Sequence, residues 1–167
     1  MKWKIIQTSP PRTASTVLSN LLHGFICPEE PLDYGLGASA TNKDIVVTHD
    51  DNIDRWESKL GDEYVLYFVV SERPQRGSVI ESRYYNYDRV LRFNFNELNA
   101  VDGYCVRDVV DVVHGKLEQF LPKEIMLNKL TALGRLENMN KFYEEIKDRP
   151  FTYHDLFYHL HGTHRTR

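Results

Sequence analysis

The segment that most constrains the fold is residues 64–70, with the sequence YVLYFVV, in which every side chain is aliphatic or aromatic. A strand with one face in water alternates apolar and polar side chains, whereas a continuously apolar run is typical of a strand covered on both faces. Helices cover both faces mainly in parallel sheets. We therefore expect residues 64–70 to form a strand at the centre of a mainly parallel sheet.

Shorter β-rich runs and helical patterns alternate on both sides of this segment. They predict strands at residues 4–8, 44–48 and 90–95, and helices at residues 15–22, 53–60 and 78–87. Apolar residues at helical spacing predict one further helix from Val106 to Leu121 and a second from Leu133 to Lys147. This order indicates an α/β fold with a mainly parallel central sheet flanked by helices and a helical C-terminal part. Residues 1–167 contain no internal repeat or linker, so we expect a single domain.

Charge, hydropathy and cysteine spacing argue against several classes of partner and site. A net charge of −3 and an isoelectric point near 6.2 argue against a general nucleic-acid binder, which usually carries a strongly basic face. No window is apolar enough for a membrane span or a secretory leader, so we expect a cytoplasmic protein with neither nucleic-acid nor membrane partners. Cys27 and Cys105 lie far apart and outside any CxxC pattern, which predicts buried thiols rather than a disulfide or a zinc site.

The loop between the first expected strand and the following helix, residues 9–17, is the first candidate binding site. Such a loop brings backbone N–H groups and the positive end of a helix dipole to one point, where α/β proteins hold phosphate. The Walker pattern GxxxxGK[ST] is missing, so an ATP or GTP phosphotransferase would lack its usual phosphate lysine. The alternative is structural: Ser9 and Thr13 cap the helix, and Arg12 is a solvated surface residue.

Residues 11–16, PRTAST, resemble the loop with which sulfotransferases bind the 5′-phosphosulfate group of 3′-phosphoadenosine 5′-phosphosulfate (PAPS), roughly Pro-(Lys/Arg)-Ser-Gly-(Ser/Thr)-Thr. Arg12 stands at the basic position, and Ala14 replaces the usual glycine, so the loop must accommodate a Cβ atom. The resemblance implies a P-loop three-layer fold and a catalytic role for Arg12, which would neutralise charge on the leaving oxygen. It also implies a set of cofactor-binding residues, namely Pro11, Arg12, Thr13, Ala14, Ser15 and Thr16.

The second expected strand closes with Val47-Thr48-His49, which is similar to the Lys-Thr-His sequence that follows the second strand of cytosolic sulfotransferases. In that family the histidine is the base, and the resemblance implies this catalytic role for His49, although Val47 replaces the lysine. The position suits a base, because ligands bind outside the carboxyl ends of parallel strands and imidazole titrates near neutrality. Alternatively, His49 caps the next helix or packs in the core. Asp50 and Asp51 are weaker bases at neutral pH.

A SERP turn that contains Arg73, and an SRYYNY segment that begins at Ser82, resemble the family's 3′-phosphate motif. The resemblance implies that Arg73 and Ser82 bind the 3′-phosphate, for which a guanidinium and a hydroxyl are suited. In the family the arginine lies two residues before the proline and the serine follows sooner, so Arg76 or Arg83 could substitute. The alternative is a basic exposed turn at the edge of the sheet.

Beyond Pro122 the glycine-rich Arg-Lys-Gly lid of the family is absent, and the chain ends in HLHGTHRTR. Arg165, with or without Arg167, is our candidate to replace the lid at the 3′-phosphate. The alternatives are a solvated terminus and a metal site formed by the histidines of residues 154–164, which lack the cysteine or carboxylate of a regular pattern. We expect that no metal is required.

Together these motifs lead us to expect a sulfotransferase that moves a sulfuryl group from PAPS to an acceptor hydroxyl or amine by in-line displacement. The product would be 3′-phosphoadenosine 5′-phosphate (PAP), and the acceptor a small molecule or a glycan. Two other functions stay open. One is a P-loop nucleotide or metabolite kinase, which would need Mg²⁺ and a phosphate lysine. The other is a non-catalytic nucleotide-binding protein of the same fold, to which Val47, Ala14 and the missing lid point.

Overall fold

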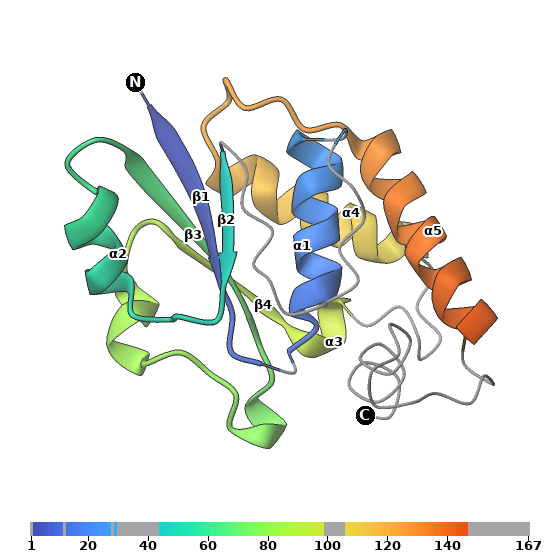
Figure 1. The fold of residues 1–167 in the computed structure, drawn as a ribbon, viewed down its shortest axis with the longest axis horizontal. Helices are drawn as coiled ribbons and strands as arrows, with labels where there is room; N and C mark the ends of the chain where they lie inside the picture. The colour runs from blue at the N-terminus through green and yellow to red at the C-terminus, as the bar shows by residue number, and fades with distance from the viewer. Residues whose placement is uncertain (1, 12, 28, 30–43, 99–105, 147–167) are drawn as a thin grey trace.

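The centre of the molecule is a four-stranded sheet in which all paired strands are parallel (Figure 1). The computed structural model describes residues 2–11, 13–27, 29, 44–98 and 106–146. The strands lie in the order β2 (Ile45–Thr48), β1 (Trp3–Thr8), β3 (Val65–Glu72) and β4 (Val90–Asn94). β3 has a neighbour on each side. The expectation that the continuously apolar segment forms an inner strand of a parallel sheet is therefore confirmed.

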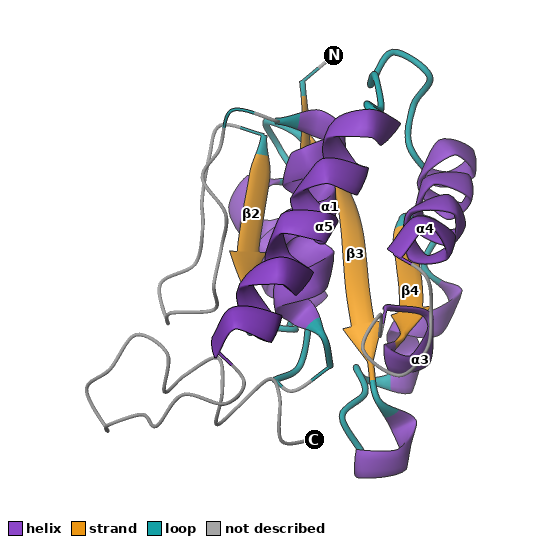
Figure 2. Ribbon diagram, turned by 90° about the vertical axis from the view of Figure 1, so that its right-hand side faces the viewer, coloured by secondary structure: helices purple, strands orange, loops and turns teal. Residues whose placement is uncertain are grey.

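Helices cover both faces of this sheet. On one face pack α1 (Ser15–Ile26), α4 (Val106–Phe120) and α5 (Lys129–Ile146), and Figure 2 looks onto this layer. On the other face packs α2 (Ile53–Leu60). Successive strand side chains alternate between the two layers: Ile5 belongs to the first hydrophobic cluster, and Ile6 to the second. The predicted α/β class, with helices flanking a parallel sheet, is confirmed.

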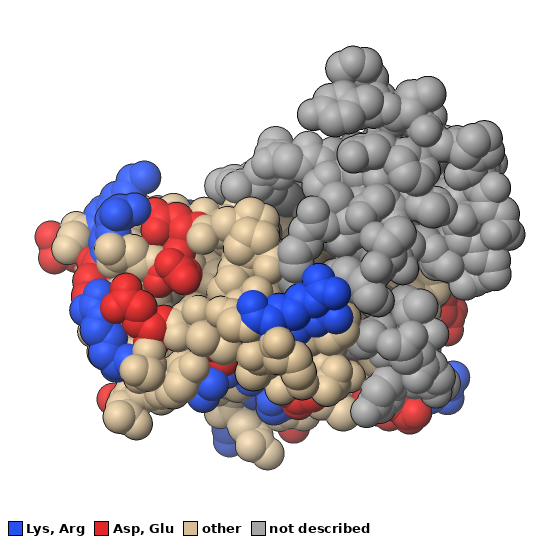
Figure 3. All heavy atoms as spheres, turned by 90° about the horizontal axis from the view of Figure 1, so that it is seen from below, with Lys and Arg blue, Asp and Glu red and all other residues tan. Residues whose placement is uncertain are grey.

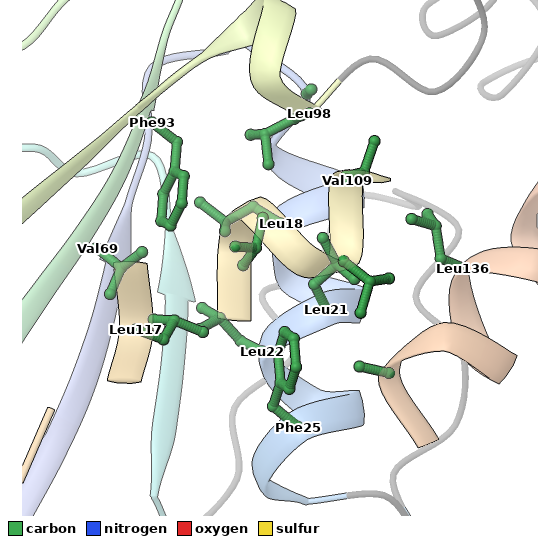
Figure 4. Packing of buried hydrophobic residues seen from close by; sticks show 14 of the residues in the cluster. Leu18, Leu21, Leu22, Phe25, Val69, Phe93, Leu98, Val109, Leu117 and Leu136 are labelled. Atoms are coloured by element: carbon green, nitrogen blue, oxygen red, sulfur yellow. The ribbon is translucent and has the colours of Figure 1, made fainter. Parts of the chain in front are cut away.

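The larger hydrophobic core lies between the sheet and the helices α1, α4 and α5 (Figure 4). Buried side chains of α1 meet Val69 and Phe93 from the sheet, Leu117 from α4 and Leu136 from α5. Burial of one such leucine or phenylalanine contributes about 1.5–3 kcal/mol relative to an exposed side chain. Because α1 begins directly after the loop that follows β1, this core fixes the place of the loop.

The interface between α1 and α5 depends on one close backbone approach. A Cβ atom added at Gly24 of α1 would lie 2.7 Å from the Cα of Ala132 in α5. The hydroxyl of Thr131 also donates to the carbonyl of Gly24, so the backbone of α1 is reached directly from α5. These contacts require glycine at position 24 and hold α5 against the helix that follows the candidate loop.

The expected helix over residues 78–87 forms only in part. Arg73 and Ser78 form an antiparallel bridge around the turn η1 (Pro74–Arg76), and the short 3₁₀ helix η2 (Ser82–Asn86) follows. The backbone N–H of Ile80 donates to the carboxylate of Glu72 at 2.9 Å. The start of this segment is therefore bonded to the end of β3 and not within a helical turn, which the apolar spacing of the sequence could not reveal.

Parallel pairing brings the carboxyl ends of the strands to one edge. Thr8 of β1 lies in register with Thr48 of β2, and Gln7 lies in register with Val69 of β3. The residues that follow these strands, among them Ser9 and His49, therefore emerge side by side. This edge faces downward in Figure 1, where the strand arrows point.

Candidate functional site

The candidate site is built from the loops that leave the carboxyl ends of β1, β2 and β3. Figure 3 views the molecule from this edge, with a basic group in the middle of the described face and acidic and basic side chains together at its left. Ligands of open parallel sheets bind outside this edge. The predicted residues within the described part of the chain can therefore be placed relative to one another.

His49 is held by the loop that follows β1. Its Nδ1 atom lies 2.7 Å from the carbonyl oxygen of Ser9, and the backbone N–H of Ser9 donates to the carbonyl of Thr48 at 3.2 Å. A carbonyl oxygen only accepts, so Nδ1 carries the hydrogen, and in the neutral ring Nε2 keeps its lone pair. The residue is exposed. His49 thus has the tautomer of a general base with the basic nitrogen away from the Ser9 carbonyl.

His49 neither caps α2 nor packs in the core, the two structural alternatives considered for it. The side chain that caps α2 is Asn52, whose Oδ1 accepts from the N–H of Arg55 at 3.0 Å. Since His49 is exposed, it does not pack in the core either. The rival carboxylate of Asp50 accepts from the N–H of Asn52 at 3.2 Å and pairs with Arg55 at 2.8 Å, so it serves the start of α2.

Three buried hydroxyl residues tie the loop to β3. The backbone N–H of Ser71 donates to Oγ of Ser9 at 3.0 Å. The hydroxyl of Thr13 donates to the carbonyl of Pro10 at 2.8 Å, and its oxygen lies 2.7 Å from Oγ of Ser71. Ser9, Thr13 and Ser71 are fully buried. The loop between β1 and α1 is therefore fixed from two sides, by β2 through Ser9 and by β3 through Ser71.

The start of α1 has the geometry of an anion site. Ala14, its N-cap, has φ 66° and ψ 33°, the left-handed conformation, and is the one non-glycine residue with positive φ in the described ranges. This conformation favours glycine, the residue usual at this position in the family that the loop resembles. The first intrahelical bond is Leu18 N–H to Ala14 O, at 3.1 Å. The N–H groups that precede it, including those of Ser15 and Thr16, have no carbonyl of α1 to bind.

Electrostatics at this helix start also favour an anion. The first turn of α1 contains no acidic residue, and no side chain caps it. The positive end of the helix dipole is therefore left without a protein counter-charge in the described loop. Gln7 supports the turn from below, because its Nε2 donates to the carbonyl of Ser15 at 2.8 Å. Pro11 is exposed beside this turn, and Arg12 lies outside the described residues.

Arg73, directly after β3, presents an unsatisfied donor. Its guanidinium carbon lies 3.9 Å from the centre of the Phe95 ring, a cation–π contact. Its Nη1 is buried and has no hydrogen-bond acceptor among the described residues. Burial lowers the pKa of Arg73, and the charge of Arg76 lowers it further. An anion placed here would satisfy the donor and offset both effects.

No hydrogen bond joins Ser82 to Arg73 in the described part of the chain. Arg73 packs on Phe95, which belongs to the cluster on the α1 side, whereas η2 packs through Tyr84, which belongs to the cluster on the α2 side. Ser82 is exposed at the start of η2. Of the possible substitutes, Arg83 is paired with Asp54 and Glu81, and Arg76 is exposed on η1.

Two residues that contribute to the site, Ser71 and Glu72, were given no role from the sequence. Ser71 follows the apolar run of β3, and a polar residue at a buried strand position is a sign of hydrogen bonding. Glu72, only 3% exposed, accepts from Arg92 Nε at 2.5 Å and from Ile80 N–H at 2.9 Å. A carboxylate at the end of a buried strand is the signal that could have identified it.

Several other predictions concern residues near or beyond this site. Val47, at the position of the family lysine, packs partly buried against the larger core. Cys27 is partly exposed, contrary to the expectation of a buried thiol, and Cys105 lies outside the described residues. Arg165 and the tail histidines of residues 154–164 also lie outside them. Among the described side chains, no group of three His, Cys, Asp or Glu residues could hold a metal ion.

None of the helices in the described ranges has the length and apolar character needed to cross a membrane. No protein-family model, no curated protein and no solved structure matches this chain. The geometry of the strand ends and the residues they carry are therefore the basis of any functional assignment.

Proposed function

We propose that this chain is a sulfotransferase of the P-loop type, which takes PAPS as donor and a small-molecule or glycan hydroxyl or amine as acceptor. One observation carries the proposal: the imidazole of His49 is bonded through Nδ1 to the carbonyl of Ser9, in the loop that ends at the start of α1. A candidate base and a candidate phosphate-binding helix start are thus mounted on the same short loop.

The residues at the edge of the sheet suit a nucleotide with phosphate at both the 3′ and the 5′ position of the ribose. The N–H groups at the start of α1, from Thr13 to Thr16, would hold the 5′ side, with Pro11 and Ala14 shaping the turn. The buried and unsatisfied Nη1 of Arg73 would hold the 3′-phosphate. Ser82 and Arg165 stay proposed contributors to that phosphate. When bound, PAPS supplies an activated sulfuryl group.

His49 has the chemistry that the acceptor requires. Its Nε2 would take the proton from the acceptor hydroxyl or amine, and the charge that develops on the ring would be shared with the Ser9 carbonyl through Nδ1–H. Arg12, adjacent to the described part of the loop, is proposed to neutralise negative charge on the leaving oxygen. Positioned donors supply this stabilisation, and the proposal includes no metal ion.

The kinase alternative needs a lysine at the phosphates and Mg²⁺. Residues 9–17 contain no lysine, and this disfavours it. The non-catalytic alternative needs only the nucleotide site. It differs from our proposal in the role of His49, because a protein that only binds has no use for a base whose lone pair is kept available.

Arg73 offers the sharpest test of the nucleotide site. Arg73→Ala should weaken PAP binding by ~1.5–3 kcal/mol, the scale of a charge-assisted hydrogen bond. Arg76→Ala is the matched control, since it removes a nearby exposed arginine, and it should leave the dissociation constant within about twofold. Equal losses in both variants would mean that PAP senses only the general positive charge of residues 73–76. No loss in either variant would remove Arg73 from the site.

Catalysis is tested separately, with labelled PAPS and a panel of phenols, alcohols, amines and glycans. Transfer of label to one acceptor class, lost in His49→Ala while PAP still binds, is the expected result. Binding of PAP without transfer to any acceptor class would favour the non-catalytic alternative. Phosphate transfer from Mg²⁺–ATP would instead select the kinase.

A further inference from the structure

Ser71 is a buried hydroxyl directly after the apolar run of β3. It is fully buried, and it follows Val69 and Val70 in β3. An unpaired hydroxyl in such a place costs about 1–3 kcal/mol, so its hydrogen bonds decide whether it is tolerated. The hydroxyl lies 2.7 Å from Oγ1 of Thr13, and the backbone N–H of Ser71 donates to Oγ of Ser9; both Ser9 and Thr13 belong to the loop before α1.

The direction of these bonds follows from the acceptors. The carbonyl of Pro10 can only accept, so the single hydroxyl hydrogen of Thr13 is directed to it, at 2.8 Å. In the 2.7 Å contact between Thr13 and Ser71, the hydrogen must then come from Ser71. A relay runs from Ser71 Oγ to Thr13 Oγ1 and on to the carbonyl of Pro10. It closes the turn directly before the left-handed Ala14.

The same residue is joined by its backbone to the second anion-binding element. Arg73, with its buried and unsatisfied Nη1, lies two positions after Ser71 in the chain. One side chain therefore links the end of β3, which carries Arg73, to the turn that orients the N–H groups of α1. The hydrogen bonds between this strand and the loop are shielded from water, because Ser9, Thr13 and Ser71 are all fully buried.

We propose that Ser71 is a positioning residue that fixes the separation between the α1 anion site and Arg73. It thereby selects nucleotides that carry phosphate at both the 3′ and the 5′ position of the ribose. The inference rests on the proposed function for its ligand. It assigns Ser71 no contact with substrate. Its effect is on the gain in affinity that the second phosphate provides, since that gain depends on both anion sites being held at a matching distance.

The test compares two ligands, PAP and adenosine 5′-phosphate, on the full chain. Ser71→Ala should lower the ratio of their affinities by about 3- to 10-fold, the effect of losing one hydrogen bond. Ser71→Thr, which keeps the hydroxyl, should recover most of the ratio even if the added methyl group lowers thermal stability. Val70→Ala, which cuts the core on the other face, is a control for destabilisation alone and should leave the ratio unchanged. An unchanged ratio in Ser71→Ala, or an equal change in Val70→Ala, would overturn the inference.

A second measurement separates this inference from the proposed function. If the wild-type chain binds neither nucleotide, the function fails, and Ser71 is judged on the free protein. Exchange of the Leu18 amide, whose N–H donates to the carbonyl of Ala14, should then be about 3- to 10-fold faster in Ser71→Ala, with exchange in α4 unchanged. Thr13→Val, which breaks the same relay, should show the same local effect, and combining the two changes should add little. Unaltered exchange at Leu18 would contradict the relay.

Discussion

The Nδ1 atom of His49 lies 2.7 Å from the carbonyl oxygen of Ser9, forty residues earlier in the chain. This bond crosses from the end of β2 to the end of β1, where the two strands are already in register at Thr8 and Thr48. It determines which ring nitrogen is basic and holds it at the edge where the loop before α1 begins. The position of the candidate base therefore depends on the same loop as the candidate phosphate site.

Replacement of His49 should separate binding from turnover. His49→Ala should leave the PAP dissociation constant nearly unchanged and lower transfer to any accepted substrate by ~10²–10⁴, the usual cost of removing a general base. His49→Asn is the matched variant, because its amide N–H can still donate to the Ser9 carbonyl but supplies no base. Calorimetry and labelled transfer are the measurements. Full transfer in either variant would remove His49 from the mechanism, and lost binding in both would make it structural.

Replacement of Ala14 by glycine should stabilise the fold. A non-glycine residue in the left-handed region is strained by about 1–2 kcal/mol, which the loss of a small buried methyl group and the greater flexibility of unfolded glycine partly offset. We expect Ala14→Gly to raise the free energy of unfolding by up to about 1 kcal/mol in urea denaturation. A clear loss of stability would show that the turn does not hold Ala14 in this conformation.

Two glycines in helices should respond to alanine in opposite directions. Gly24→Ala should destabilise the fold by about 1–3 kcal/mol, because the new Cβ would meet the Cα of Ala132 in α5. Gly115→Ala, in α4, meets nothing within 4 Å and should stabilise by about 0.5–1 kcal/mol through helix propensity. Thermal and denaturant unfolding of both variants give the comparison. The same sign of change in both would contradict the described packing of α1 on α5.

The change of stability between neutral and acid pH should depend on Asp54. A hydrogen bond from Tyr87, joined by Arg83, holds the pKa of Asp54 below its ordinary value. A lowered pKa means that the carboxylate stabilises the fold above the unfolded-state pKa of about 4, and that this stabilisation is lost as pH falls through the lower folded-state value. Asp54→Asn should therefore be less stable than the wild type near neutrality, with the gap closing below pH of about 4.

The control for this prediction is Asp62→Asn, which neutralises an exposed carboxylate outside the Tyr87 and Arg83 cluster. Its stability relative to the wild type should change little between neutral and acid pH. A pH-independent gap for Asp54→Asn would show that Asp54 is not held in its charged form by these partners.

Much of the fold was predictable because the dominant signals are local. The continuous apolar run of β3 and the helical spacing of α2 are readable from a few adjacent residues, and the structure confirms both. The segment after β3 was not predictable in this way. Its donors bind Glu72 and the end of β3, so a tertiary contact overrides an apparently helical pattern. For the same reason the role of Ser71 appears only when β3 and the loop before α1 are placed together.

The candidate site shows the same division. The position of His49 at a strand end could be predicted from the sequence, but its bond to Ser9 could not, because the pairing of β1 with β2 creates it. Arg73 and Ser82 looked like one motif along the chain. In the fold, the first packs toward α3 (Phe95–Leu98) and the second begins a turn that packs on the α2 side. Sequence spacing alone does not report the face of the sheet on which a residue falls.

The central claim is that this edge of the sheet recognises a nucleotide with a 3′-phosphate. The most direct measurement is the pair of dissociation constants for PAP and for ATP, by calorimetry on the full chain, with ATP tested both with and without Mg²⁺. We predict that PAP binds more tightly than ATP by at least about tenfold, or 1.4 kcal/mol, and without added metal. Equal affinity for the two nucleotides, or tighter binding of Mg²⁺–ATP, would contradict the account.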